Sequence, residues 1–302
     1  MTQLAPLVDL HRHLDGSLRE STLRELAAER GMSLPDALRF YRGMGLKDAL
    51  ARFEVTLSVL QAPGEVRRVA GEICEDARSE GVGTLEIRFA PQLHRGAPSE
   101  DIVDAALTGI DGRAGLILCG LYGEDPAVIE SLVDIGIRRK GVVGVDLAGG
   151  PAPGHSWSMA DYATAFSTAR DHGLGRTVHA GEGRAPQEIA MAINLLHAQR
   201  IGHGTTLLDD PAVVDLVLDR GVTLEACPTS NIHTGVIATL EEHPLGRWLE
   251  RGIAACVCTD NTFFSDVDAP TEFRAVCEAQ GLSEKQRQAV VECGVRAAFS
   301  GD

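Results

Sequence analysis

The sequence lacks the features that would place the protein in a membrane or on nucleic acid. No apolar run approaches the roughly 20 residues that a membrane-spanning helix needs. The first residues contain no basic segment followed by an apolar stretch, so we expect no signal peptide. Positive charge is in deficit: the formal net charge is -15, which disfavours nucleic acid and anionic membranes as partners and favours a soluble protein.

Paired cysteine motifs are also missing. The 7 cysteines are scattered along the chain without a CxxC pair. Cys256 and Cys258 lie two apart in an apolar run, so we expect them on one face of a strand. An odd number of scattered cysteines favours reduced, buried thiols, and we therefore expect a cytoplasmic protein.

What the sequence does contain is a regular alternation of strand and helix patterns. Its 302 residues, 44% of them hydrophobic, suit one α/β barrel, and no linker or repeat divides residues 1–302, so we predict a single domain. Eight apolar runs rich in β-branched residues predict strands at Leu7–His11, Thr84–Phe89, Gly115–Leu121, Val142–Leu147, Arg176–His179, Arg200–Gly202, Thr223–Ala226 and Ala254–Thr259. Helical patterns separate them at Arg19–Arg30, Lys47–Leu60, Glu65–Glu80, Asp101–Leu107, Ala127–Arg138, Met159–His172, Pro186–His197, Pro211–Arg220 and Pro244–Arg251, and two more follow at Pro270–Ala279 and Ser283–Phe299.

This order predicts a (β/α)8 TIM barrel with extra helices after the first strand. A doubly wound open sheet is the main rival, but no dinucleotide-binding fingerprint follows the first strand. The surplus segment, roughly Ser33–Leu60, follows the first strand on the rim side, where it could cap a site as a lid.

Short polar segments follow several of the predicted strands and suggest a metal site. His11 and His13 are two apart at a strand end, so both side chains point the same way. His179 ends the fifth predicted strand and Asp260 the eighth. Three imidazoles and one carboxylate suit zinc, with a water completing the coordination, and a barrel brings these strand ends to one mouth.

Two further residues fit a hydrolytic site but have plainer explanations. Glu182 lies three residues after His179, where a buried carboxylate could move protons, although it could also be an acid near the start of a helix. His203 lies between two glycines and could approach a ligand or be an ordinary core histidine. The remaining histidines are expected to be structural or solvated: His94, His155, His172, His197, His233 and His243.

Taken together, these segments resemble adenosine deaminases over nearly the whole chain, from His11 to Ala298, in the family's order. The segments that carry the resemblance are Val8–Ser17, Glu86–Pro91, Asp146–Gly149, His179–Glu182, Arg200–Gly204, Cys227–Asn231 and Thr259–Asn261. The resemblance implies hydrolytic deamination of adenosine and 2′-deoxyadenosine to the inosine product and ammonia, by a zinc-activated water that attacks purine C6.

The resemblance also implies a role for each site residue. It implies one Zn2+ per chain, held by His11, His13, His179 and Asp260. Glu182 would protonate purine N1, and His203 would orient and deprotonate the water. The remaining contacts to the substrate would come from His13, Asp15, Gly149 and Asn261, with Asp15 on the ribose 5′-hydroxyl.

Two departures from the family pattern affect the substrate side. Many members carry Asp at the position of Asn261; an amide there still donates a hydrogen bond to purine N7 at any pH. The stretches Leu34–Arg52 and Pro98–Gly115 are shorter than in typical members, which bears on the ribose side of the pocket.

Other functions remain open to different degrees. Related 6-aminopurines share the chemistry at C6, so aminodeoxyfutalosine, an N6-substituted adenosine or adenine are alternative substrates. A binuclear amidohydrolase usually needs a lysine at the end of the fourth strand, where this chain has Asp146-Leu147, and cytidine-type deaminases carry a PCxxC signature that is missing. A barrel that binds a ligand without catalysis is a distant alternative. The oligomeric state is not predicted.

Overall fold

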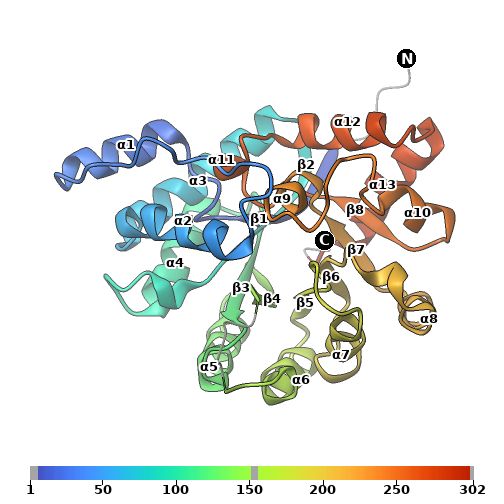
Figure 1. The fold of residues 1–302 in the computed structure, drawn as a ribbon. Helices are drawn as coiled ribbons and strands as arrows, with labels where there is room; N and C mark the ends of the chain where they lie inside the picture. The colour runs from blue at the N-terminus through green and yellow to red at the C-terminus, as the bar shows by residue number, and fades with distance from the viewer. Residues whose placement is uncertain (1–5, 151–155, 300–302) are drawn as a thin grey trace.

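Eight parallel strands form one sheet that follows the chain order from β1 to β8. The computed structural model describes residues 6–150 and 156–299. The strands are β1 (Leu7–His13), β2 (Val82–Phe89), β3 (Gly115–Leu121), β4 (Val142–Ala148), β5 (Gly175–Ala180), β6 (Arg200–His203), β7 (Thr223–Ala226) and β8 (Ala255–Val257). Helices surround them in Figure 1, so the predicted (β/α)8 barrel is confirmed.

The helices match the predicted patterns with a few additions. They are α1 (Glu20–Glu29), α2 (Leu46–Val59), α3 (Pro63–Ser79), α4 (Ser99–Ile110), α5 (Pro126–Ile137), α6 (Ala163–Asp171), α7 (Gln187–Leu195), α8 (Pro211–Arg220), α10 (Leu245–Glu250), α12 (Ala269–Ala279) and α13 (Glu284–Ala297). Short helices α9 (Pro228–His233) and α11 (Thr262–Ser265), with the 3-10 turns η1 (Pro91–Leu93) and η3 (Leu207–Asp209), were not predicted because they are too short to show a period. The 3-10 turn η2 (Met159–Tyr162) forms the start of the helical stretch predicted at Met159–His172.

Local sequence explains where several helices begin. Asp125 caps α5 by accepting a hydrogen bond from the Ala127 amide at 3.0 Å, and Pro126 occupies the first helical position. Asp210 and Pro211 repeat this arrangement at the start of α8. The aspartates satisfy amides that the first turn leaves free, and the prolines need no partner there.

The eighth strand is shorter than the sequence predicts, and this changes the position of Asp260. We expected a strand over Ala254–Thr259 with Asp260 at its end, but β8 stops at Val257. Asp260 has a left-handed backbone, with φ of 62°, which regular strand geometry does not allow. Its amide donates to the His11 carbonyl at 2.8 Å, and the His13 amide donates to its carbonyl at 2.8 Å, so Asp260 itself joins β1 to the β8 end of the sheet.

The inside of the barrel contains charged residues among its aliphatic ones. Buried charged side chains there include Glu86 and Arg88 from β2, Asp146 from β4, Arg200 from β6 and Glu225 from β7. Buried charges are costly unless they are paired. This layer therefore has to be a network of ion pairs, and it lies directly beneath the polar segments at the carboxyl ends of the strands.

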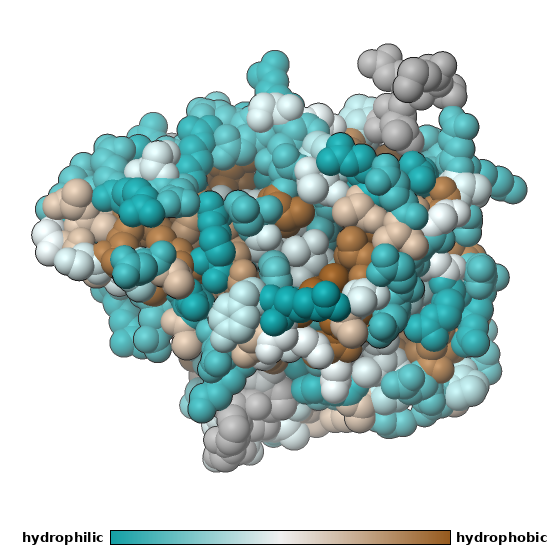
Figure 2. Space-filling view, turned by 45° about the horizontal axis from the view of Figure 1, so that its top comes forward, coloured by the Kyte–Doolittle hydropathy of each residue, from teal (hydrophilic) through white to brown (hydrophobic). Residues whose placement is uncertain are grey.

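The outer surface agrees with the acidic composition. The face drawn in Figure 2 is mostly hydrophilic, and its apolar side chains are gathered in small patches. In the part of the chain that the structure describes, no helix combines the length and the hydrophobicity that crossing a membrane requires.

Candidate metal centre

The four predicted metal ligands converge at the carboxyl end of the barrel. His11 and His13 come from β1, His179 from β5, and Asp260 from the segment after β8. The Nε2 atoms of His13 and His179 are 3.3 Å apart. One carboxylate oxygen of Asp260 lies 3.4 Å from Nε2 of His13 and 3.6 Å from Nε2 of His11. The structure thus brings together residues that are separated by as many as 249 positions in the sequence.

The donor set fits a tetrahedral divalent ion. Ring nitrogens of His11, His13 and His179 all lie within 4.8 Å of one another. Zinc–nitrogen bonds of 2.0–2.1 Å place neighbouring ligand atoms about 3.3 Å apart in a tetrahedron, close to the separations that involve Asp260 and the His13–His179 pair. Nε2 of His11 is fully buried and makes no hydrogen bond with any described residue. A bound cation would satisfy that nitrogen.

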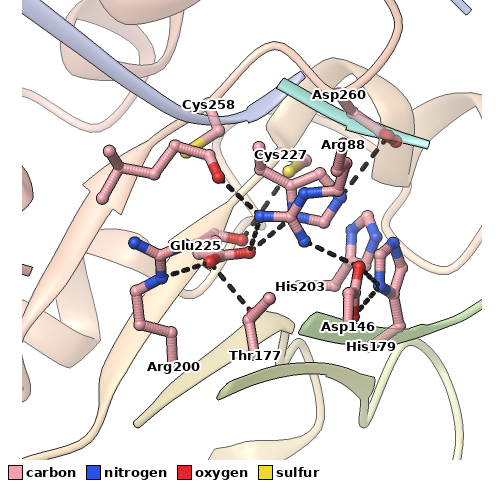
Figure 3. Close-up of polar contacts among 12 residues, drawn as sticks. Arg88, Asp146, Thr177, His179, Arg200, His203, Glu225, Cys227, Cys258 and Asp260 are labelled. Atoms are coloured by element: carbon pink, nitrogen blue, oxygen red, sulfur yellow. Dashed lines mark hydrogen bonds and ion pairs between the residues drawn. The ribbon is translucent and has the colours of Figure 1, made fainter. Parts of the chain in front are cut away.

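The other ring nitrogen of two of these histidines faces a buried carboxylate. Nδ1 of His11 lies 2.7 Å from Oε2 of Glu225, and Nδ1 of His179 lies 3.0 Å from Oδ2 of Asp146. A histidine that donates from Nδ1 to a carboxylate leaves Nε2 as a lone pair, which is the form that binds metal. Figure 3 shows both carboxylates held by Arg88 from β2, at 2.9 Å in each case.

Burial sets the charge of the histidines. It lowers the pKa of His11 and of His13 well below the ordinary value, and the positive charge of Arg88 lowers both further, so both rings are neutral at physiological pH. Burial also lowers the pKa of His179, but attraction to Asp146 outweighs it and leaves that pKa raised. For Asp260, burial raises the pKa of the carboxyl. A divalent ion would favour the deprotonated form of every ligand.

A second grouping involves a thiol and is a weaker candidate. His11, His203 and Cys227 also have possible ligand atoms within 4.8 Å of one another. Burial raises the pKa of the Cys227 thiol well above its ordinary value, and its Sγ donates to the Glu225 carbonyl at 3.7 Å. Because a thiol binds metal as thiolate, this environment favours the histidine and aspartate set.

Glu182 and His203 lie next to the convergence point. Nε2 of His203 is 3.8 Å from Oε2 of Glu182, and the Thr234 hydroxyl donates to the other Glu182 oxygen at 3.2 Å. His203 has φ of 66°, a conformation that costs energy for a residue with a side chain and is often found at functional sites. Burial lowers the pKa of His203, and its Nδ1 lies 3.1 Å from the Asn231 side-chain amide nitrogen.

Besides His13, three residues are expected to contact the substrate, and they surround the opening at the carboxyl end of the barrel. Burial raises the pKa of Asp15 to about 7, and its Oδ1 has no hydrogen-bond partner within the described ranges. Oδ1 of Asn261 is likewise buried without a partner in residues 6–150 and 156–299. Gly149 has φ of 73°, which favours glycine, and its backbone lines the opening.

The opening joins two cavities. The inner one, about 60 Å³, is lined by Gly149, Glu182, His203 and Asn261 together with three of the convergent ligands. The outer one, about 450 Å³, shares His13, Leu50, Phe53 and Gly149 with it and extends over Asp15. Leu50 and Phe53 belong to α2, so the predicted lid segment does lie over the site.

Several residues of the centre were missed by sequence reasoning. Glu225 was not singled out, and Arg88, Asp146 and Arg200 were noted only as parts of motifs, without a role. Their signal is a single charge inside an otherwise apolar strand, such as Glu225 between Leu224 and Ala226. A lone charge in a strand that is buried on both faces has to find a partner across the barrel.

None of the other described histidines lines either cavity. His94 contacts the Leu60 carbonyl through Nδ1, and burial lowers its pKa to about 4. Burial lowers the pKa of His243 to about 3. His172, His197 and His233 contact Thr168, Arg170 and Ser265, respectively. His155 falls outside the described residues.

Comparisons with known proteins agree with this geometry. The sequence profile described as Adenosine deaminase matches residues 6–302. A curated adenosine deaminase of Klebsiella pneumoniae is 36% identical over 320 residues, covering 98% of this chain and 94% of the relative.

Two solved structures share the fold. The Arabidopsis N6-mAMP deaminase has a TM-score of 0.88 at 25% identity and covers 99% of this chain and 94% of its own. An amidohydrolase from Burkholderia ambifaria, solved with bound Zn, has a TM-score of 0.87 at 25% identity over 99% of this chain and 86% of its own. With a matching profile over nearly the whole chain and close curated relatives, the protein belongs to the adenosine deaminase family.

Proposed function

We propose that the protein hydrolyses the 6-amino group of adenosine and 2′-deoxyadenosine, giving the inosine product and ammonia. The observation that carries the proposal is the convergence of His11, His13, His179 and Asp260 beside Glu182 and His203, at the floor of one cavity. Curated relatives of the chain bear the name adenosine deaminase, which supports the same reaction.

The proposed cofactor is one zinc ion per chain, held by His11, His13, His179 and Asp260. Three histidines and one carboxylate would fill a tetrahedral site, so a water would enter as a fifth ligand, an expansion that catalytic zinc allows. When bound, the metal lowers the pKa of a coordinated water toward neutrality and so supplies the nucleophile. The described residues that surround the ligands then have to hold the purine and move the protons.

Glu182 and His203 are the proposed proton carriers. Glu182 is 5% exposed and lies beside the convergence point, so a purine in the inner cavity would place N1 within its reach. A protonated Glu182 would donate to N1 and make C6 more electrophilic. His203 is neutral because burial lowers its pKa, so its ring can accept the proton that the water gives up.

The remaining contacts orient the substrate. The Asn261 amide would donate to purine N7, and the backbone at Gly149 would approach the ring closely because no side chain intervenes. Asp15 would accept the 5′-hydroxyl of the ribose with the oxygen that has no partner in the described chain. An unpaired buried oxygen is costly, so a substrate hydroxyl there stabilises the complex.

The outer cavity favours a nucleoside over a nucleotide. Its acidic lining side chains are Asp15, Glu54 and Glu124, and the described lining includes neither lysine nor arginine. A 5′-phosphate would meet these acids without a cation to pair with. A nucleotide such as the one for which the Arabidopsis N6-mAMP deaminase is named would therefore suit this cavity poorly.

The cytoplasm remains the proposed location. All 7 cysteines are free and buried, although Cys256 and Cys258 lie with their sulfurs 3.7 Å apart. Unpaired thiols are typical of a reducing compartment.

Ultraviolet absorbance of the zinc-loaded protein with a panel of substrates tests the proposal. The panel is adenosine, 2′-deoxyadenosine, adenine, aminodeoxyfutalosine and adenosine 5′-monophosphate. We expect a spectral change with the two nucleosides and at least about 100-fold lower kcat/KM for adenine and the nucleotide. Turnover of aminodeoxyfutalosine alone would move the substrate to a modified adenosine. No turnover of any compound would favour a barrel that binds without catalysis.

A further inference from the structure

The opposite end of the barrel is closed by Phe299, which follows α13. Its ring occupies the space next to Gly144 on β4 and Gly175 on β5. A Cβ atom at Gly175 would come within 2.2 Å of Phe299 Cγ, and one at Gly144 within 2.8 Å of the ring. The absence of side chains at these two positions therefore makes room for the aromatic ring.

Phe299 lies on the guanidinium of Arg200, one of the buried charges inside the barrel. Cζ of Arg200 is 3.6 Å from the ring centroid, a close cation–π contact. Nη2 of Arg200 donates to Glu86 at 2.5 Å, and Nη1 donates to the Ala297 carbonyl at 2.9 Å. The Phe299 amide donates to the other oxygen of Glu86 at 2.5 Å. The end of α13 thus fixes Arg200 through the Ala297 carbonyl, and Phe299 fixes it through its ring.

Arg200 in turn holds the carboxylate behind His11. Nε of Arg200 is 2.7 Å from Oε1 of Glu225, and Oε2 of the same side chain is 2.7 Å from Nδ1 of His11. Figure 3 shows Glu225 between Arg200 and the histidines, with Thr177 donating to it at 3.0 Å. A continuous chain of contacts therefore runs from Phe299 through Arg200 and Glu225 to His11.

We propose that Arg200 and Phe299 are positioning residues for the metal ligand His11, acting from the far end of the barrel. Arg200 would hold the Glu225 carboxylate in place against Nδ1 of His11, and the ring of Phe299 would keep water away from Arg200. This role rests on the proposed metal centre, and it extends the residues that hold His11 in place to Phe299, after the end of α13.

The packing explains why the ring matters. A cavity of about 580 Å³ adjoins this end of the barrel and is lined by Arg200, Thr223 and Phe299 among others. If the ring were shortened, water from that side would reach the guanidinium. Hydration weakens the pairing of Arg200 with Glu225, because charges attract each other less in a medium of higher dielectric constant.

Cobalt binding to the purified, metal-stripped protein tests the proposal without any assay of activity. The variants are Arg200→Met, Phe299→Leu and Phe299→Tyr, the last keeping the aromatic ring. Visible absorption of bound Co2+ reports ligand geometry, and competition with a chelator gives the Kd. We expect Arg200→Met to weaken Co2+ binding about 10- to 100-fold, and Phe299→Leu about 3-fold or more with a changed spectrum, whereas Phe299→Tyr retains both.

Leu132→Ala is the control for general loss of stability. Leu132 is buried on α5 and takes no part in the chain of contacts, so its truncation should lower Tm and leave the Kd and spectrum unchanged. If Phe299→Leu lowers Tm like Leu132→Ala with wild-type Kd and spectrum, the ring has no positioning role. If Arg200→Met does not fold, the pair of Phe299 variants still decides. If the wild type binds no Co2+, the metal centre itself is refuted.

Discussion

The carboxyl end of the barrel and the layer beneath it differ in how they pair buried acceptor atoms, although Nε of Arg88 and Nε of Arg200 in the lower layer also lack a hydrogen-bond partner among the described residues. In the lower layer, Glu225 has four partners and Asp146 has three, and both are fully buried. At the carboxyl end, buried atoms of His11, Asp15 and Asn261 have no hydrogen-bond partner among the described residues. Because an unpaired buried polar atom is costly, the difference separates the part that holds its shape from the part that needs a ligand.

The largest effect is expected from removing Asp260, the proposed ligand whose backbone also joins β1 to the β8 end of the sheet. Asp260→Ala should abolish metal binding and turnover, since three histidines remain but the carboxylate is lost. Elemental analysis and adenosine turnover measure this. A full zinc content in the variant would show that Asp260 is not a metal ligand.

Next in size is the loss of the proposed acid. Glu182→Gln should lower kcat by about 100- to 10,000-fold, because a glutamine cannot donate a proton to N1. Zinc content and the Kd for inosine should stay near the wild-type values, which separates a chemical role from a structural one. Near-normal turnover would assign Glu182 to structure, supported by its contact with Thr234.

A smaller and selective effect is expected at Asp15. Asp15→Ala should weaken inosine binding by about 10- to 100-fold, because the ribose hydroxyl loses its partner. Hypoxanthine, which has no ribose, should bind as before. Calorimetric titration of both compounds measures the ratio, and an equal loss for both would remove Asp15 from the ribose.

The smallest effect on activity is expected at Glu272, a buried carboxyl on α12. It accepts hydrogen bonds from the backbone amide and the hydroxyl of Thr229, yet no ion pair within 4 Å links it to a cation in the described chain. Burial raises its pKa to about 7 from the ordinary 4.5. The folded state therefore binds more protons than the unfolded state, and stability falls as pH rises from about 4.5 to 7.

Replacing this carboxyl by an amide should remove that pH dependence. Between pH 4.5 and 7, the free energy of unfolding of Glu272→Gln should fall by about 3 kcal/mol less than that of the wild type. Urea denaturation at several pH values, compared with wild type, measures it. Parallel curves for both proteins would show that Glu272 does not titrate in this range.

The sequence was sufficient for features that depend on neighbouring residues. Alternation along β1 correctly placed His11 and His13 on one side, and strand order correctly brought His179 to the same mouth. It also brought Asp260 to this mouth, but it missed the left-handed backbone of this residue, which forms hydrogen bonds with β1 beyond the end of β8. It also could not choose partners for Glu225, since Arg88 and His11 lie 137 and 214 residues away.

The junction made by Asp260 has a consequence for the order of events during synthesis. The peptide groups of this one residue bond to β1, and its side chain completes the proposed ligand set. Long-range contacts of this kind form late, because the two ends of the chain have to meet. While residue 260 is still inside the ribosome, the nascent chain can present only the three histidines of the proposed ligand set to a metal. Tight metal binding would therefore require that the Asp260 segment has reached β1, and the bound metal would itself favour this closing of the barrel.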